Sequence, residues 1–545
     1  MGLLRLLRTS ALAAVAALTA AGCTGGGGND DRSGADPSYE IVVNTPAAKG
    51  PIDKAKWSLY AEPQTLDYAY AFDFPVNTVL ANVCDSLLRE NPDFSITPGL
   101  ASKYANPDPL TWVYTLREGV KFHDGTAFSA KDVVASLKRH QDPAIGSSYA
   151  TVFKDVESIT ETGPLEVTIK LTRPNVLLNE QLAAAPGTIE SADFLAKAGK
   201  DYGNPQGGVN CTGPFSLKEW KPGTAITLKK NDAYWDSTLI PKTGELEFVF
   251  IQDAAARANA FITGEIDGGY LIPTNSYDKL KTSKGKLYFG AITGSYSAAV
   301  TNLKGPLGDV RVRKAMSIAI DREGIVAAAL SGYGTPAKAG IPAAGWATIP
   351  ADRAKAQYDA LPDLAQDVAA AKKLVEEAGA GGKKIVVATS PVAPEITVAA
   401  NELQRAGEEI GLEVELRTIA PDAYTALFTD PTTREGIDLL ITSGYDMTPD
   451  PLEFYQALQT GEFANYGSWS NPEYDAIIKQ ALGTADPGAR ATLTAKAQDI
   501  VLREVPGIPL WDSPMSLYLG ERVTGVTPNI THLSYPWAAT LGSAT

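Results

Sequence analysis

Residues 385–441 read IVVATSPVAPEITVAANELQRAGEEIGLEVELRTIAPDAYTALFTDPTTREGIDLLI. Three short apolar or alternating runs in this segment have the length and pattern of strands: 385–388, 412–416 and 437–441. The stretches between them, 396–410 and 421–429, are compatible with helices. Strands and helices that alternate in this order are typical of a largely parallel sheet covered by helices. We therefore predict an α/β fold.

The chain before residue 300 has a different pattern, with more strands than helices. Residues 112–116 and 165–171 alternate apolar and polar side chains, as half-buried strands do. One helix is expected between them, capped by Ser129, with Asp132 three residues later, and stopped by Pro143. Because helical spacing dominates after residue 300, we predict two unlike lobes.

Composition argues against several classes of function. The 545 residues are 44% apolar, enough for more than one hydrophobic core. The formal net charge is −15 and basic residues form no long run, so we predict that the protein does not bind nucleic acid. Three histidines and three cysteines are scattered along the chain. Local spacing assembles no zinc site, and we expect neither a metal nor a cofactor.

The first residues are typical of an export signal. Two arginines precede a short apolar run, which is shorter than the roughly 20 residues that span a bilayer. Residues 18–23, LTAAGC, resemble a bacterial lipobox, although Ala20 stands where Leu, Val or Ile is usual. We predict a lipoprotein signal peptide over residues 1–22 and lipidation of Cys23. The alternative is a soluble secreted protein with an ordinary cleavage site.

Residues 24–38 read TGGGGNDDRSGADPS. Glycine and polar residues cannot bury apolar area, so we predict a flexible tether over residues 23–50 between a lipid anchor and a globular body. A single acyl chain binds a membrane only marginally, and stable anchoring would need several. The expected location is the extracytoplasmic face of the bacterial cell membrane.

Two cysteines remain in the exported body, Cys84 and Cys211. An even pair in an oxidising compartment more often forms a disulfide than stays as two thiols, so we favour the bond. The alternative is that both are small buried hydrophobic residues.

Several motifs follow one another over nearly the whole chain. They are EPQTLD at 62–67, PGLA at 98–101, LREGVKFHDG at 116–125, FSAKDVV at 128–134, TGPF at 212–215, WKPG at 220–223, NDAYW at 231–235, GEID at 264–267, DVRVRKA at 309–315 and AIDR at 319–322. Each is weakly specific alone. Together they resemble the family-5 extracellular solute-binding proteins of ATP-driven (ABC) importers, the dipeptide- and oligopeptide-binding lipoproteins.

This resemblance implies an α/β, two-lobed periplasmic-binding-protein-like fold, class II and type C, with an extra subdomain inserted in the first lobe. We place the first lobe at 51–295 plus 513–545, the inserted subdomain at about 86–205 and the second lobe at 296–512. Each of the two crossovers between the lobes is a hinge candidate. The resemblance also implies binding without catalysis, and the sequence has neither a Gly-x-Ser-x-Gly nor a His-Glu-x-x-His motif.

The resemblance points to a ligand site after a strand of the second lobe. Peptide-binding relatives pair the peptide's α-ammonium with an Asp there, and the matching stretch here is SGYDMTPDP at 443–451. We assign this role to Asp446. Asp450 is the alternative, because the spacing to the Asp-Pro pair is one residue longer than in the family pattern. Both could instead be turn-forming aspartates. Three residues are expected to lie beside the peptide backbone: Ser443, Gly444 and Tyr445.

Two further aromatic or titratable residues of the first lobe need a role. Tyr149 matches a tyrosine that reaches the peptide from the subdomain, and its alternative role is a core residue. His123 has no nearby histidine or cysteine, so we predict that it stabilises a turn.

One stretch departs from the family pattern. Dipeptide binders carry an arginine for the α-carboxylate after a second-lobe strand, and residues 390–397, SPVAPEIT, contain none. A short peptide clamped there through its carboxylate is therefore disfavoured.

We therefore expect a monomeric, lipid-anchored protein that captures peptides between two lobes and delivers them to ABC transporter permease subunits. The alternative is the same fold with haem, a metal chelate or a sugar as cargo, or a ligand sensor. Peptide length and side-chain preference remain open.

Overall fold

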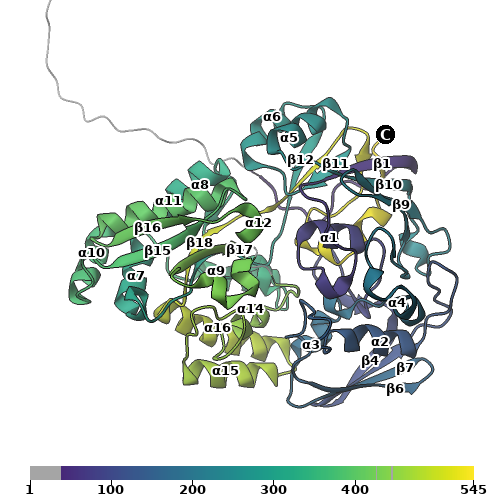
Figure 1. Cartoon of the computed structure of the whole chain (residues 1–545), viewed down its shortest axis with the longest axis horizontal. Helices are drawn as coiled ribbons and strands as arrows, with labels where there is room; N and C mark the ends of the chain where they lie inside the picture. The colour runs from purple at the N-terminus through teal and green to yellow at the C-terminus, as the bar shows by residue number, and fades with distance from the viewer. Residues whose placement is uncertain (1–38, 425, 444–445) are drawn as a thin grey trace, which may run out of the picture. The chain divides into compact units, whose positions relative to one another are not determined.

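The computed structural model describes residues 39–424, 426–443 and 446–545. The predicted signal peptide, residues 1–22, the lipidation site Cys23 and the tether up to residue 38 lie outside the described residues. The described chain is built around three sheets of four or more strands (Figure 1).

The first sheet has seven strands in the order β12-β19-β11-β1-β10-β9-β8. Its strands are β1 (Ile52–Leu59), β8 (Phe215–Lys221), β9 (Ala225–Lys230), β10 (Thr243–Phe250), β11 (Gly268–Tyr270), β12 (Lys286–Gly290) and β19 (Met515–Leu519). Strand β1 pairs in parallel with β10 and β11. Its central position explains why its second half, with Trp57 and Leu59, is buried.

The second sheet has six strands in the order β14-β18-β13-β17-β15-β16. Its strands are β13 (Tyr296–Val300), β14 (Thr335–Pro336), β15 (Lys384–Thr389), β16 (Glu413–Thr418), β17 (Leu439–Ser443) and β18 (Gly507–Asp512). Strand β15 is parallel to β16 and β17, but β13 is antiparallel to both of its neighbours. The prediction of a largely parallel sheet from residues 385–441 therefore holds for β15, β16 and β17 and is wrong for the rest of the sheet. Strands β13 and β18 enter the sheet from distant parts of the chain.

The strands change sheet at the two predicted lobe boundaries, between Gly290 and Tyr296 and between Asp512 and Met515. We use "first lobe" for the part with the seven-stranded sheet and "second lobe" for the part with the six-stranded sheet. In Figure 1 the second-lobe strands β15, β17 and β18 lie apart from the first-lobe strands β1, β9 and β10.

A third sheet lies within the predicted subdomain. It is antiparallel, in the order β4-β5-β7-β6, with strands β4 (Ala101–Asp108), β5 (Thr111–Leu116), β6 (Val156–Gly163) and β7 (Glu166–Leu171). Helix α2 (Ala130–Arg139) contacts β6 and β7. As predicted, it begins after Ser129, whose N–H and hydroxyl both donate to Asp132 Oδ2 at 2.9 Å. The shared core of this sheet and the seven-stranded sheet joins them in one lobe.

Helices complete each lobe. The first lobe has α1 (Phe74–Leu80), α3 (Leu177–Gln181), α4 (Ala192–Ala198), α5 (Ala254–Thr263) and α6 (Tyr277–Lys281). The second has α7 (Val310–Ala319), α8 (Arg322–Leu330), α9 (Ala351–Asp359), α10 (Val368–Glu377), α11 (Pro394–Glu409), α12 (Pro421–Tyr424), α13 (Ala426–Thr429), α14 (Leu452–Ala457), α15 (Pro472–Leu482) and α16 (Pro487–Glu504). Among the described helices, none is long and apolar enough to cross a membrane.

Helices α14, α15 and α16 pack around a separate hydrophobic cluster of the second lobe. Leu177 of the first-lobe helix α3 is buried in the same cluster, and Val176 N–H donates to Leu482 O at 3.0 Å. Figure 1 shows α3 beside this group. Helix α3 is therefore a point of contact between the lobes.

Residues 39–50 pack against the first lobe, which corrects the second part of the predicted tether. Thr45 is buried, and its N–H and hydroxyl both donate to Val526 O, at 2.9 and 3.0 Å. Val42 N–H donates to Phe289 O at 2.9 Å, and Tyr39 packs on the Phe289 ring. The glycine-rich composition of residues 24–38 does not continue past Tyr39, and the side chains that follow can add to the core.

Candidate ligand-binding site

Asp446 begins the described part of the loop that follows strand β17, and this loop lies where the lobes meet. Thr293, in the first crossover, holds its backbone: the Thr293 hydroxyl donates to Asp446 O at 2.9 Å and accepts from Asp446 N–H at 3.0 Å. The next side chain, Met447, packs against the hydrophobic core of the first lobe. The sheet and the crossover therefore fix Asp446 at the boundary between the lobes.

The carboxyl group of Asp446 is buried and only partly compensated, since the backbone N–H of Phe454 donates a hydrogen bond to it. The residue is 8% exposed, and its Oδ2 has no hydrogen-bond partner among the described residues. Burial raises the pKa of this carboxyl well above its usual value, and the charges of Glu453 and Asp450 raise it further. A buried carboxylate without a partner is strongly penalised. The group would gain most from a positively charged group of a ligand.

Asp450, the alternative ligand residue, already has its partners. Arg490 Nε donates to its Oδ2 at 2.5 Å, and Leu452 N–H donates to its Oδ1 at 2.9 Å. Asp450 thus binds an arginine and the start of helix α14. These contacts favour a structural role for Asp450 and leave Asp446 as the candidate.

Asp446 and four other carboxyl groups form a connected group, which we name the interlobe acidic cluster. They are Glu90, Glu180, Asp446, Asp450 and Glu453. Contacts across the lobes hold the cluster together: Arg490 Nη2 donates to Glu180 Oε1 at 2.8 Å, and Gln181 Nε2 donates to Glu453 Oε1 at 3.2 Å. Burial raises the pKa of Glu453 to about 7, and burial together with the charge of Glu453 raises that of Glu90 to about 8.

Strand β17 leads to the site with one edge partly free. It pairs with β13 along its whole length, with Ser443 opposite Tyr296, but it pairs with β15 only at Leu439 and Leu440. Past Leu440, residues 441–443 have no ladder partner on the β15 side among the described residues. Such an edge can pair with an extended ligand backbone. Gly444 and Tyr445, also predicted to line the ligand, lie outside the described residues.

Tyr149 lies inside the first lobe. It is 5% exposed, its hydroxyl donates to Ala71 O, and its ring packs edge-on against His140. Burial raises the pKa of this phenol, and the charge of Glu453 raises it further. The core role that we considered as the alternative accounts for its contacts, although the effect of Glu453 shows that it lies near the acidic cluster.

The stretch without an arginine carries an acid instead. Glu395 lies at the start of helix α11, and burial raises the pKa of its carboxyl. This stretch therefore supplies a carboxyl group where a carboxylate clamp would need a cation, which agrees with the predicted departure from dipeptide binders.

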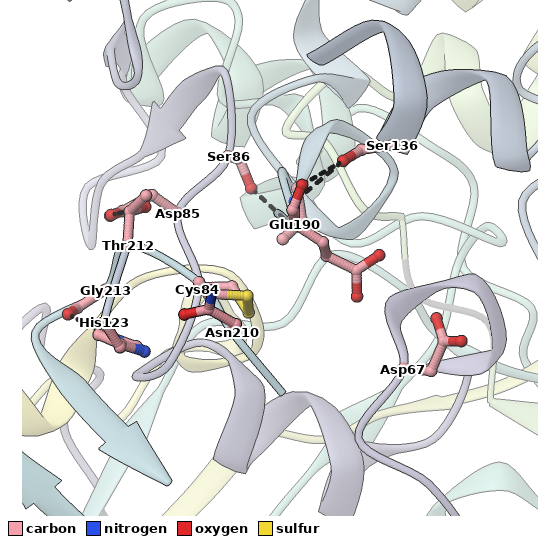
Figure 2. Close-up of a disulfide and its surroundings, with 12 residues drawn as sticks. Asp67, Cys84, Asp85, Ser86, His123, Ser136, Glu190, Asn210, Thr212 and Gly213 are labelled. Atoms are coloured by element: carbon pink, nitrogen blue, oxygen red, sulfur yellow. Dashed lines mark hydrogen bonds between the residues drawn. A yellow bond between two sulfur atoms is a disulfide. The ribbon is translucent and has the colours of Figure 1, made fainter. Parts of the chain in front are cut away.

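The region around the disulfide of the first lobe has a structural role (Figure 2). Cys84 and Cys211 are joined by a disulfide, the pairing favoured from the sequence. Beside it, Asp85 accepts hydrogen bonds from Tyr234 Oη at 2.6 Å, Thr212 Oγ1 at 2.8 Å and Trp235 Nε1 at 2.9 Å. The NDAYW motif thus supplies packing and donors to Asp85 and no ligand cage.

His123 also has a structural place. Its backbone N–H donates to Cys211 O at 2.8 Å, and its Nε2 lies 3.0 Å from Gly213 O. Burial lowers the pKa of the ring. No group of three or more His, Cys, Asp or Glu residues in the described part of the chain could hold a metal ion.

Sequence reasoning missed most of the interlobe acidic cluster. Glu453 follows the Asp450-Pro451 pair by two residues, at the start of helix α14, so its closeness in sequence was a usable signal. Glu90 and Glu180 come from the first lobe, hundreds of residues earlier, and only the fold brings them near Glu453.

Solved structures define the class of protein. The structure of AgaA from A. tumefaciens R10, a PBP in complex with agropinic acid, superposes with a TM-score of 0.78 at 23% identity, covering 90% of this chain and 99% of that one. The oligopeptide-binding protein AppA from Bacillus subtilis, in complex with a nonapeptide, gives 0.76 at 20% identity, covering 91% and 100%. The predicted two-lobed, periplasmic-binding-protein-like α/β fold is therefore confirmed.

Sequence comparison defines the family. The dipeptide-binding protein DppE of Bacillus subtilis (strain 168) is 26% identical over 524 residues, which cover 91% of this chain and 95% of DppE. The family model "Bacterial extracellular solute-binding proteins, family 5 Middle" matches residues 95–466, more than half of the chain. The chain therefore belongs to family 5 of the bacterial extracellular solute-binding proteins, the binding components of ABC importers, and it is a binding protein rather than an enzyme.

Proposed function

We propose that the protein captures peptides between its two lobes and delivers them unchanged to the permease of an ABC importer. The observation that carries the proposal is the buried Asp446 carboxyl at the boundary of the lobes, whose Oδ2 has no partner in the part of the chain that the structure describes. The α-ammonium of a peptide has the charge and the donors that this group needs. Asp446 is then the residue that fixes the amino end of the cargo.

The backbone next to Asp446 supports an extended ligand. Residues 441–443 keep one edge free of ladder pairing with β15. A peptide laid along this edge would satisfy its own N–H and C=O groups whatever its side chains are. Ser443, Gly444 and Tyr445 would then lie beside the first residues of the peptide.

Related proteins support peptides as cargo. DppE is named a dipeptide-binding protein, and AppA is an oligopeptide-binding protein solved with a nonapeptide. AgaA, with agropinic acid, has a different cargo on a similar fold. A metal ion bound directly by the protein has no support, since no group of His, Cys, Asp or Glu among the described residues could hold one.

Attachment to the outer face of the cell membrane through Cys23 completes the proposal. The lipobox-like segment at residues 18–23 and the glycine-rich residues after it support a lipid anchor on a tether. Mass spectrometry of the mature amino terminus would test it: the expected species starts at Cys23 and carries acyl chains. A mature chain that starts elsewhere, without lipid, would contradict it.

Native mass spectrometry of protein purified from its host tests the cargo. We expect peptides with a free amino terminus, bound one per protein and recovered intact after denaturation. Cargo that lacks a primary amine would contradict the role of Asp446, and cleaved peptides would contradict binding without catalysis.

A further inference from the structure

The interlobe acidic cluster contains far more negative than positive groups. Its five carboxyl groups share one guanidinium, that of Arg490, which binds Asp450 and Glu180. Glu453 has only neutral donors, since Thr448 N–H and hydroxyl donate to its Oε2 at 2.9 Å and Gln181 donates to Oε1. Three carboxyl groups of the cluster, Glu90, Asp446 and Glu453, therefore have no cationic partner among the described residues.

Other buried carboxylates of the protein are compensated differently. Arg139 binds both Asp67, at 2.5 Å, and Glu190, at 2.6 Å. Asp438 accepts from Val386 N–H and from Asn302 Nδ2, each at 2.8 Å. Buried acids elsewhere are thus held either by a cation, as Asp67 and Glu190 are, or by neutral donors, as Asp438 is. The interlobe acidic cluster differs in the number of carboxyl groups that share one cation.

Glu453 is the centre of this uncompensated charge. Its carboxyl is hydrogen-bonded to Thr448, two residues after Asp446, and to Gln181, next to Glu180. Its charge also raises the pKa of Glu90, of Glu180 and of Asp446. Glu90 is 4% exposed, whereas Glu453 is half-buried. The Ser534 hydroxyl donates a hydrogen bond to Glu90 Oε2 at 2.9 Å.

A cation larger than a metal ion fits this arrangement best. No three of the described carboxyl groups lie close enough to hold one metal ion. The cluster instead spreads its charge over groups from four elements, β2 (Leu88–Glu90), α3, the loop at 446–451 and α14. Separate positive groups on one organic ligand can each meet a different carboxylate.

We propose that the site selects cargo with at least two positive charges: an α-ammonium bound by Asp446 and a basic side chain at the amino end of the peptide bound by Glu453, with Glu90 behind it. This proposal rests on the proposed function and adds to it the chemical class of the cargo. Lysine and arginine side chains carry such a charge at neutral pH.

Isothermal titration calorimetry with matched peptides tests the proposal. The probes are peptides of two, three and five residues that begin with lysine or with norleucine and continue in alanine. Norleucine has a similar aliphatic length and lacks the ammonium group. We expect the lysine series to bind at least about tenfold more tightly, as paired charges in a poorly solvated site can do. This part of the test uses the unmodified protein.

Two variants test whether Glu453 causes the preference for lysine. Glu453→Gln should remove most of the preference for lysine over norleucine, since the charge pair with the basic side chain is lost. Glu161→Gln, which removes a charge from exposed β6, should keep the full preference. Thermal unfolding of each variant checks that it is folded.

The outcomes separate the two proposals. Equal affinity for both series, or preference for norleucine, overturns the selection for basic cargo while peptide binding stands. A preference that Glu453→Gln leaves intact in a folded protein overturns the role of Glu453. If neither series binds at any length, the proposed function fails and this proposal fails with it.

Discussion

Asp85 and Asp446 are buried to a similar degree, at 6% and 8% exposed, yet they have opposite surroundings. Asp85 accepts three hydrogen bonds and has Arg89 Nη2 at 3.7 Å. Asp446 has an oxygen with no partner in the described residues and two carboxyl groups nearby. The fold satisfies the carboxylate of Asp85 and leaves Asp446 Oδ2 without a partner among the described residues, as its proposed ligand role requires.

This difference fixes what substitution should do at each position. A hydrogen-bonded buried carboxylate contributes stability because its loss leaves several donors unpaired. An unpartnered carboxylate among like charges costs stability, and its loss relieves that cost. Stability should therefore depend on the Asp85 region, and binding should depend on Asp446.

The largest effect on stability should come from the disulfide beside Asp85. The bond between Cys84 and Cys211 closes a segment with a sequence separation of 127 residues, and removing it frees the unfolded chain. We expect the Cys84→Ser, Cys211→Ser double variant to lose about 4 kcal/mol of unfolding free energy in urea titrations. An unchanged urea midpoint would show that the disulfide does not stabilise the folded protein.

Asp85→Asn should cost almost as much. The amide cannot accept from Tyr234, Trp235 and Thr212 together, so at least one buried donor loses its partner. We expect a loss of about 3 kcal/mol in unfolding free energy, measured by the same titration. A variant as stable as the parent would show that the hydrogen bonds of Asp85 contribute no more to the unfolding free energy than Asp446 does.

Asp446→Asn should give the reverse pattern. We expect unfolding free energy equal to or above that of the parent, because a buried carboxyl with nearby like charges is removed. Peptide affinity, measured by calorimetry, should fall by about 2–3 kcal/mol when the ammonium loses its partner. Unchanged affinity in a folded variant would exclude Asp446 from the site.

The fold was predictable where local patterns decide it. The alternating runs at 112–116 and 165–171 lie in β5 and β7, and the expected helix after Ser129 is α2. The sheet of the second lobe was not predictable in full, because β13 and β18 join it from far away in sequence and run antiparallel. The alternation of apolar and polar residues indicates where strands form, but it does not indicate which strands pair.

The candidate site was predictable only in part, for the same reason. Resemblance to a known family pointed to Asp446 and Asp450, and it could not rank them. Two structural observations rank them. Arg490, in a helix 40 residues later, binds Asp450, and Asp446 Oδ2 has no hydrogen-bond partner among the described residues. Partners of this kind are set by tertiary packing and leave no local signal in the sequence.

The smallest expected effect is a dependence of stability on pH. Burial raises the pKa of Glu453 to about 7 and of Glu90 to about 8, in surroundings that include Asp446, Asp450, Glu180 and the single cation Arg490. The folded state therefore binds more protons than the unfolded state between pH 4.5 and 8, and stability falls as pH rises through this range.

The window from pH 7.5 to 8.5 separates these carboxyl groups from the histidines and from most of the titration of Glu190, whose pKa burial raises to about 7. Burial lowers the pKa of His140 to about 4 and of His532 to about 3. Their contribution to stability is therefore nearly complete only at about pH 7.5, where the unfolded histidines, with a pKa of about 6.5, have lost their protons. We expect the unfolding free energy of the ligand-free protein to fall on the order of 1 kcal/mol across the window. Glu453→Gln should flatten the slope, and a rising slope in the parent would contradict the assignment.

The most direct test of the account measures the pairing between Asp446 and the amino group of a peptide. Calorimetry would compare one peptide with its N-acetylated form, against the parent protein and against Asp446→Asn. We expect acetylation to cost the parent at least about 2 kcal/mol of binding free energy and to cost the variant almost nothing. An equal cost of acetylation in both proteins would show that the ammonium binds elsewhere and would contradict the central claim.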